Sequence, residues 1–174
     1  MIKTLAILAG EPNSISSEII FKCWKLKRKF KHKNFFIIGN IDILNKQKKK
    51  LKYKIKIKEI NTKFKKSDLI TDDLPVFNIK YYQKRPFEKI SKKSNGYILE
   101  SFNKVINLIK INKIQGFINC PISKKHLLGS KHQGITELLA KRFNVSGNEV
   151  MLIFNKKLSV SPVTLHIPLK QVSK

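Results

Sequence analysis

The sequence predicts an α/β fold with three layers, α/β/α, around a mainly parallel sheet. Short apolar runs alternate along the chain with segments whose apolar residues recur at helical spacing, which is typical of a sheet covered by helices. Hydrophobic residues make up 41% of the sequence, which is compatible with a real core and argues against wholesale disorder. At 174 residues the chain holds one domain, or one domain and part of a second.

The first predicted elements are a strand, a turn and a helix. Residues 4–8 read as a buried-type strand, and residues 10–14 form the turn that follows it. A helix is expected from residue 15 to about residue 30, with an apolar face formed by Ile15, Ile19, Ile20, Cys23 and Trp24. We expect Cys23 to be a small core residue, as free cysteines usually are.

The middle of the chain continues the alternation. A second strand is expected at residues 35–38, stopped by a Gly-Asn pair, and a second helix at residues 42–50. Residues 54–59 alternate apolar residues with lysines, and we interpret them as an edge strand protected by charge. After an irregular stretch, residues 76–79 form the next strand.

The clearest helix spans residues 94–110. Its buried stripe is expected to comprise Ile98, Leu99, Phe102, Val105, Ile106 and Ile109, with Glu100, Asn103, Lys104 and Asn107 facing outward. A short strand at residues 116–118 and a helix at residues 136–143 follow. Two further strands, at residues 150–154 and 158–165, are joined by a polar turn, and His166 stands where the second of them ends.

The net charge of +26 is more simply explained by composition than by a binding surface. The excess consists of 34 lysines against 3 arginines, whereas proteins that read phosphates and bases usually enrich arginine. The chain also has 25 isoleucines and 14 asparagines, and all three residue types have A/T-rich codons. We therefore expect no nucleic-acid partner, and the lysine-rich stretch at residues 46–58 is the one place where that alternative stays open.

Localisation and redox chemistry follow from what the sequence lacks. The longest apolar runs are far too short to span a bilayer, and the N-terminus does not have the pattern of a signal peptide. We therefore expect a cytoplasmic protein with no membrane partner. The two cysteines, Cys23 and Cys120, form no C-x-x-C pair, so neither a zinc-finger nor a redox motif is present.

The turn at residues 10–18 is the first candidate binding segment. It lies between a strand and a helix, where free backbone N–H groups and the helix dipole favour an anion. It has only one glycine, so it fits neither a P-loop nor a dinucleotide-binding loop. Its three serines, Ser14, Ser16 and Ser17, are more typical of helix caps than of ligands.

The second candidate segment, residues 119–124, follows a strand. Lys124 is placed to bind a phosphate or carboxylate as a point charge, although most lysines of so basic a chain are solvated surface groups. Cys120 would need a general base to act as a nucleophile, and the sequence assigns none. We reject a thiol enzyme for this reason.

Two more candidates lie nearer the C-terminus. Thr136 opens a helix and is either its N-cap or a ligand, with the cap favoured by composition. His166 is either a hydrogen-bonded structural residue or a metal ligand, and a metal would need two or three further ligands. The other histidines, His32, His126 and His132, show no ligand spacing with it.

The order and spacing of these segments resemble the 4-hydroxythreonine-4-phosphate dehydrogenase family of pyridoxal phosphate biosynthesis. The shared patterns are a G-[DE]-P turn (Gly10-Glu11-Pro12) with Glu18 in the next helix, P-I-x-K (Pro121 to Lys124), G-x-T-E-x-L (Gly134 to Leu139), V-M-L (Val150 to Leu152) and T-x-H-[IL]-P-L (Thr164 to Leu169). The resemblance runs across the whole chain and is dense from about residue 116 onward.

The resemblance implies a function. The family oxidises the 3-hydroxyl of 4-phosphohydroxy-L-threonine with NAD, and the 3-oxo acid that results decarboxylates. A divalent metal held by histidines of both subunits of a homodimer binds the substrate. By matching, His166 is a metal ligand and Thr136 contacts the substrate, while Lys124 lies at the crevice and binds substrate there. The implied fold is similar to isocitrate and isopropylmalate dehydrogenases, with the site between two α/β domains.

The sequence departs from the family at several positions. Ile135 stands where the family has a substrate-binding histidine, and Ser14 and Ser16 lie in a turn that is glycine-rich in the family. Family members are also much longer. We expect an N-terminal portion of such an enzyme, with a first domain at residues 1–118 and a truncated second domain at residues 119–174.

Two further hypotheses stay open. One is a non-catalytic α/β module that binds an anionic or phosphorylated ligand or pairs with itself. The other is a basic RNA-associated protein.

Overall fold

The computed structural model describes residues 4–29, 35–129, 134–164 and 169–172. The chain divides into two compact units, Met1–Leu127 and Leu128–Lys174. The first contains a parallel sheet with its helices, and the second contains a helix and a small hairpin. The domain boundary expected after residue 118 stays a prediction for the complete protein.

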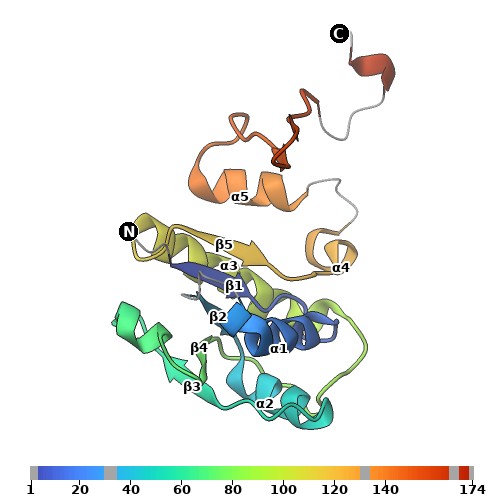
Figure 1. Ribbon diagram of the computed structural model, residues 1–174. Coiled ribbons are helices and arrows are strands. Elements are labelled where there is room, and N and C mark those ends of the chain that lie inside the picture. Colours follow the sequence, from blue (N-terminus) through green and yellow to red (C-terminus); the bar gives the residue numbers. More distant parts are fainter. Residues whose placement is uncertain (1–3, 30–34, 130–133, 165–168, 173–174) are drawn as a thin grey trace. The chain divides into compact units, whose positions relative to one another are not determined.

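A five-stranded parallel sheet forms the centre of the first unit (Figure 1). Its strands are β1 (Leu5–Leu8), β2 (Phe35–Gly39), β3 (Ile57–Ile60), β4 (Leu74–Asn78) and β5 (Gly116–Asn119). They lie in the order β3-β4-β2-β1-β5, and every neighbouring pair is parallel. Strand β3 lies at an edge, which confirms the edge-strand prediction, although the strand begins later than expected.

Three helices cover the faces of this sheet, α1 (Ser16–Leu26), α2 (Ile41–Lys50) and α3 (Asn95–Lys110). The β1–α1–β2 connection leads toward one edge of the sheet, whereas β4–α3–β5 leads toward the other. Because such crossovers are right-handed, α1 and α3 lie on opposite faces. Helix α1 contacts α2, while α3 contacts β1 and β2. The predicted α/β/α architecture is therefore confirmed for this unit.

The core consists of apolar side chains on both faces of the sheet. On the face of α1 and α2, a buried cluster includes Phe21, Trp24 and Ile37. Successive strand residues point to opposite faces, so Phe36 lies on the other side, where its ring centre is 4.9 Å from that of Phe64. A continuous apolar strand such as Phe35–Gly39 is thus covered on both sides, as parallel strands usually are.

The predicted buried face of α1 is partly wrong. Cys23 is exposed, and so are Ile15 and Ile19, with 63% and 38% of their surface accessible. The buried residues are Ser16, Ser17, Ile20, Phe21 and Trp24. The small serines let the start of the helix approach the sheet closely, which turns the buried stripe by about one residue. In α3, by contrast, Ile98, Phe102, Val105 and Ile106 are buried as expected, and Leu99 and Ile109 are half-buried.

The second unit contains α5 (Ile135–Phe143), β6 (Ile153–Phe154), β7 (Ser159–Val160) and the short 3₁₀ turn η4 (Leu169–Gln171). The last two strands form an antiparallel pair, with Ile153 opposite Val160. The backbone N–H of Asn155 donates to the carbonyl of Leu158 at 3.0 Å, which closes the turn. The hairpin prediction is confirmed, but the strands are shorter than expected and belong to a separate sheet.

The remaining elements of the first unit are short. They are η1 (Lys27–Lys29), η2 (Lys66–Leu69), η3 (Lys92–Ser94) and α4 (Lys124–Leu128).

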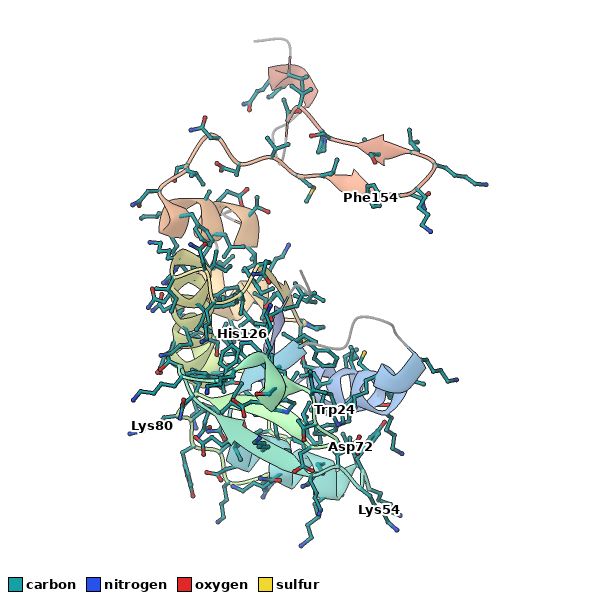
Figure 2. All side chains as sticks on the ribbon, turned by 60° about the vertical axis from the view of Figure 1, so that its left-hand side comes forward. Trp24, Lys54, Asp72, Lys80, His126 and Phe154 are labelled. Atoms are coloured by element: carbon teal, nitrogen blue, oxygen red, sulfur yellow. The ribbon has the colours of Figure 1, made fainter. Side chains whose placement is uncertain are left out.

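Much of the lysine excess is solvated. Lys54 and Lys80, for example, are exposed and extend away from the ribbon (Figure 2). Among the described residues, no helix is long and apolar enough to cross a membrane.

Candidate functional site

Polar residues gather where the strands of the parallel sheet end. The turn at residues 9–14 follows β1, and the segment at residues 119–124 follows the neighbouring strand β5. The connection from β1 leads to β2 on one side, whereas the connection from β4 crosses back past β1 to β5 on the other side. The sheet therefore changes direction between β1 and β5. In open α/β sheets ligands bind in the crevice at this point, outside the carboxyl ends of the strands.

Gly10 locks the two loops of this crevice together. Its φ angle is +69°, which favours glycine, and a Cβ atom there would lie 2.5 Å from the carbonyl oxygen of Pro121. The backbone N–H of Glu11 donates to the same carbonyl oxygen at 2.9 Å. The turn after β1 therefore packs directly on the end of β5, and a side chain at position 10 would separate them.

Glu11 places a carboxylate inside the protein at this point. Only 1% of the residue is exposed. One carboxylate oxygen accepts a hydrogen bond from the Ser94 hydroxyl at 2.7 Å, and the other accepts one from the backbone N–H of Asn13 at 3.2 Å. No Lys, Arg or His within the described ranges forms an ion pair with it. The two hydrogen bonds from neutral donors thus offset the free-energy cost of burying the carboxylate, which would be large without such partners.

The buried carboxylate changes the interpretation of the turn. Location alone favours an anion there, but Glu11 already fills the position and would repel a second negative charge. The serines are not the N-cap of α1 either: the N-cap is Ile15, which makes no side-chain cap. The Ser14 hydroxyl donates to the carbonyl of Glu11 at 2.8 Å, and its oxygen accepts a hydrogen bond from the backbone N–H of Ser16, the first residue of α1, at 3.2 Å. One of the three serines thus binds a free N–H group at the start of the helix, although it stands one residue before the N-cap.

A small cavity of about 10 Å³ lies beside Glu11, lined by Ala9, Glu11, Pro12, Ser16, Ser17, Asn40, Ile43, Leu44, Gln47 and Tyr97. The volume is sufficient for a single water molecule. The Ser17 hydroxyl is buried without a hydrogen-bond partner among the described residues. Burial raises the pKa of Tyr97 well above its usual value, a hydrogen bond from the Asn40 backbone opposes this shift, and the charge of Glu11 adds to it.

A loop after β4 closes over the same turn. The side-chain oxygen of Asn13 accepts hydrogen bonds from the Gln83 amide at 2.8 Å and from the backbone N–H of Glu88 at 2.7 Å. The amide of Gln47 donates to the carbonyl oxygens of Pro12 and Pro86, at 2.6 and 2.9 Å. The turn after β1 is therefore held from several directions and has little freedom to reshape around a ligand.

The segment after β5 presents different chemistry. Cys120 is buried, and burial raises the pKa of its thiol to about 11, so the thiol stays protonated at neutral pH. Lys124 is exposed at the first residue of α4, which follows the carboxyl end of β5.

His126 was missed as a candidate by the sequence argument. Its ring Nδ1 lies 2.7 Å from the Ser123 hydroxyl, and its backbone carbonyl accepts a hydrogen bond from the Asn95 amide at 2.7 Å. The side-chain oxygens of Asn95 and Asn119 are buried without partners among the described residues. The spacing Ser-x-x-His at the start of α4 was the available signal (Figure 2 labels His126).

Thr136 lies in the second unit, within the first turn of α5. Gly134 is the N-cap of this helix, so the prediction that Thr136 caps it was wrong. The side chain of Glu137 folds back over Gly134, and its Oε2 is buried without a partner within the described part of the chain. Lys124 belongs to the first unit and Thr136 to the second.

His166 lies outside the described residues. Across residues 4–29, 35–129, 134–164 and 169–172, no group of three or more His, Cys, Asp or Glu side chains is arranged to hold a metal ion. A divalent metal needs several such ligands in one place. The residues described here therefore do not fit a complete metal site.

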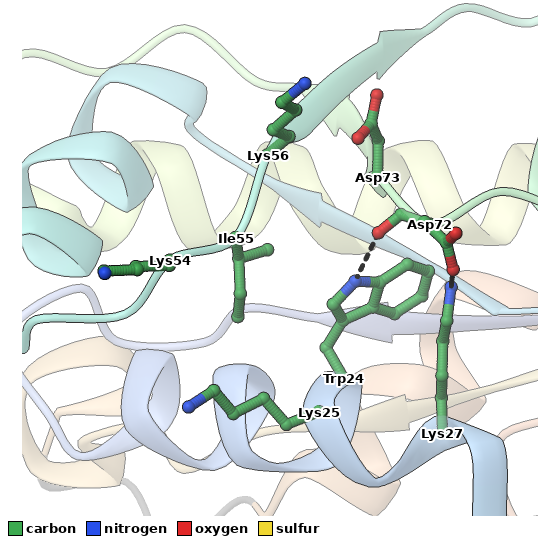
Figure 3. A pocket seen from close by; sticks show the side chains of 8 residues that line it. All are labelled: Trp24, Lys25, Lys27, Lys54, Ile55, Lys56, Asp72 and Asp73. Carbon is green, nitrogen blue, oxygen red and sulfur yellow. Dashed lines mark hydrogen bonds and ion pairs between the residues drawn. The ribbon is translucent and has the colours of Figure 1, made fainter.

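A larger pocket of about 410 Å³ lies at the opposite, amino edge of the sheet (Figure 3). Its lining residues are Trp24, Lys25, Lys27, Lys54, Ile55, Lys56, Asp72 and Asp73. The Trp24 indole donates to the carbonyl oxygen of Asp72 at 3.2 Å, and the Lys27 ammonium lies 3.7 Å from the centre of the Trp24 ring. These contacts hold the wall of the pocket together, and Lys124 is not among the residues that line it.

Comparison with known proteins gives a consistent result. Residues 31–174 match the family model described as "Pyridoxal phosphate biosynthetic protein PdxA". A 4-hydroxythreonine-4-phosphate dehydrogenase of Sulfurihydrogenibium sp. is 31% identical over 97% of this chain and 51% of its own length. One from Aquifex aeolicus is 32% identical over 99% of this chain and 52% of its own length. The chain thus spans about half the length of the curated relatives it matches.

Solved structures give the same fold. A 4-hydroxythreonine-4-phosphate dehydrogenase from Klebsiella pneumoniae superposes with a TM-score of 0.80 at 20% identity, over 97% of this chain and 53% of that one. The enzyme from Burkholderia phymatum gives a TM-score of 0.77 at 19% identity, over 97% and 51%. At these identities the structures show the fold alone. Together with the match over residues 31–174, they show that this chain belongs to the PdxA family of pyridoxal phosphate biosynthetic proteins.

Proposed function

We propose that this chain contributes one half of a 4-hydroxythreonine-4-phosphate dehydrogenase. The complete enzyme would oxidise the 3-hydroxyl of 4-phosphohydroxy-L-threonine with NAD as hydride acceptor, and the 3-oxo acid would then decarboxylate. The observation that carries this proposal is the family match over residues 31–174, because it includes both candidate substrate-binding residues. The proposal keeps the homodimer and the cytoplasmic location expected from the sequence.

Lys124 and Thr136 are the substrate-binding residues in this proposal. Lys124 is exposed at the carboxyl edge of the sheet, where an ammonium group binds a phosphate or carboxylate as a point charge. Thr136 is half-buried in the first turn of α5, with a hydroxyl able to donate to a substrate oxygen. Ile135 beside it has no polar atom on its side chain, so this chain supplies one hydrogen bond fewer than the family pattern.

The described residues do not form a complete binding site for either cofactor of the proposed reaction, the divalent metal or NAD. His166 would be one ligand of a divalent metal, and the described residues offer no group that completes the site. The turn after β1 has a single glycine and a buried Glu11, which does not fit the pyrophosphate of NAD. Both groups would therefore depend on residues outside those described.

A second candidate function is a non-catalytic module that binds a phosphorylated or anionic ligand. The observation that favours it is Ile135, whose apolar side chain stands where the family has a substrate-binding histidine. In this case Lys124 would still bind the anion, but no oxidation would follow.

One experiment separates the two candidates. The 174-residue chain is incubated with NAD, a divalent metal and 4-phosphohydroxy-L-threonine, alone and together with the C-terminal half of the Sulfurihydrogenibium relative. Formation of NADH that is lost in Lys124→Ala and Thr136→Val supports the dehydrogenase. Binding of the substrate by calorimetry, lost in Lys124→Ala and never followed by NADH, supports the module. Lys80→Ala serves as the control, because Lys80 is also exposed and lies in the loop after β4.

A further inference from the structure

The pocket at the amino edge of the sheet has a positive lining (Figure 3). Its volume of about 410 Å³ falls within the range of sites that enclose a small molecule, roughly 300–1,000 Å³. Its charged lining residues are Lys25, Lys27, Lys54, Lys56, Asp72 and Asp73. The proposed dehydrogenase reaction uses none of these side chains.

One lysine and one aspartate of the lining are already paired with each other. The Lys27 ammonium lies 3.8 Å from the carboxylate of Asp72, and it donates to the backbone carbonyl of Thr71. It also lies 3.7 Å from the centre of the Trp24 ring, whose N–H group donates to the backbone carbonyl of Asp72. This cluster builds one wall of the pocket and uses the charge of Lys27 within the protein.

The other three lysines leave a positive charge that the lining does not balance. Lys25, Lys54 and Lys56 form no ion pair within the described parts of the chain. Asp73 is the one remaining carboxylate of the lining. A concave surface with an excess of one sign of charge attracts ions of the opposite sign. The pocket therefore favours an anion that carries more than one negative charge.

Contacts with the core hold these lysines at the pocket. The Lys25 ammonium lies 5.1 Å from the centre of the Tyr53 ring, an arrangement in which the ring attracts the cation. Lys54 and Lys56 flank Ile55, which is 8% exposed and belongs to the buried cluster under α1 and α2. The core thus fixes the backbone that carries two of the three lysines. Positive groups that are placed before binding lose less freedom when the ligand arrives.

The shape of the pocket favours a small phosphorylated molecule over a nucleic acid. Proteins that bind single strands offer aromatic rings on which bases stack, but the Trp24 ring is only 4% exposed and Lys27 lies over it. A phosphate monoester carries a charge of about −1.5 to −2 at neutral pH, more than a carboxylate. Lysine binds phosphate as a point charge, so three unpaired ammonium groups suit such a ligand.

We propose that this pocket binds the phosphate group of a small molecule through Lys25, Lys54 and Lys56. The pocket lies before strands β3 and β4, whereas Lys124 follows the end of β5. The inference therefore does not depend on the proposed reaction. It gives a ligand to part of the lysine-rich stretch at residues 46–58, where the sequence left a nucleic-acid partner open.

The test uses the fluorescence of Trp24, which is the single tryptophan of the chain and lines the pocket. The 174-residue chain is titrated with inorganic pyrophosphate at constant ionic strength, and we expect a saturable change with one site per chain. The triple variant Lys25→Ala, Lys54→Ala, Lys56→Ala should raise the Kd about tenfold or more, since each exposed ion pair contributes modestly. Circular dichroism checks that this variant is folded.

A control variant with the same change in net charge separates the pocket from general attraction to a basic chain. It replaces three exposed lysines that do not line the pocket and should leave the Kd unchanged: Lys49→Ala, Lys50→Ala, Lys63→Ala. An equal loss in both triple variants would overturn the proposal, and so would the absence of a saturable change.

Two single variants complete the test. Asp73→Asn removes the carboxylate that repels the ligand and should lower the Kd about threefold, a result that does not require the triple variant to fold. Lys124→Ala should leave the Kd for pyrophosphate unchanged, because Lys124 does not line the pocket. Loss of the fluorescence change in Lys124→Ala would place the anion elsewhere and refute the proposal. A single-stranded RNA that binds more tightly than pyrophosphate through the same three lysines would refute it too.

Discussion

The two units of this chain use apolar residues in opposite ways. In the first unit, Phe21, Phe36 and Phe102 are completely buried between the sheet and its helices. In the second, Phe154 and Leu158 are about as exposed as a residue on an isolated strand, at 72% and 68%. The strands of both units have similar composition, so composition does not decide burial. The difference teaches that burial depends on which helices and strands pack over a residue, and not on the type of the residue.

The largest expected difference concerns two phenylalanines, one in each unit. Phe102→Ala removes a fully buried ring from α3 and should lower the free energy of unfolding by about 3–5 kcal/mol. Phe154→Ala removes an exposed ring and should change it by no more than about 0.5 kcal/mol. Urea unfolding followed by the fluorescence of Trp24, the single tryptophan, measures both. Equal losses would show that the hairpin is covered in solution.

A smaller difference is expected at two glycines with positive φ. Gly10→Ala combines backbone strain with a clash of Cβ against Pro121 and should cost about 3 kcal/mol. Gly147 in the second unit has a φ of +85° and nothing within 4 Å of its Cβ position, so Gly147→Ala should cost only about 1 kcal/mol of local strain. The first is measured by urea unfolding, and the second by hydrogen exchange in residues 144–149. A neutral Gly10→Ala variant would mean that the loops after β1 and β5 are not locked together.

The smallest difference concerns two buried carboxylate groups. In the native protein the two carboxylate oxygens of Glu11 accept hydrogen bonds from the Ser94 hydroxyl and from the backbone N–H of Asn13. In Glu11→Gln an NH₂ group replaces one of these oxygens and faces one of the two donors. The free energy of unfolding should therefore fall by about 1–2 kcal/mol. The Oε2 of Glu137 is buried without a partner among the described residues, so Glu137→Gln should be neutral or slightly stabilising. Thermal unfolding checks the first variant, and amide exchange in α5 checks the second. A stabilising Glu11→Gln would show that its carboxylate is strained.

Much of the fold followed from periodicity alone. Each strand of the parallel sheet, the long helix α3 and the terminal hairpin were expected from the spacing of apolar residues, because that spacing reflects which faces are covered. The position of Cys23 was not predictable in this way. Cys23 is exposed because α1 turns Ser16, Ser17 and Phe21 toward the core, and helical spacing alone does not determine that rotation.

The candidate site was less predictable than the fold. Lys124 was correctly expected at the carboxyl edge, since the end of an apolar run marks the end of a strand. The burial of Glu11 was missed because its donors come from distant segments: Ser94 lies 83 residues further along the chain. The prediction that Thr136 is the N-cap of α5 was wrong because Gly134, which has no side chain, takes that position, and its contact with substrate stays a prediction. His166 stays a predicted metal ligand.

The pairing of β1 with β5 has a consequence for biosynthesis. The backbone N–H of Thr4 donates to the side chain of Gln115, across 111 residues, and Leu5 pairs with Gly116. A ribosome must therefore make roughly two-thirds of the chain before its first strand gains its second neighbour. Sheets that close through such distant contacts form slowly and leave their intermediates open to aggregation. The net charge of +26 makes nascent chains repel one another during that interval. The lysine excess would therefore reduce aggregation of the nascent chain until strand β5 is synthesised, even where the lysines bind no ligand.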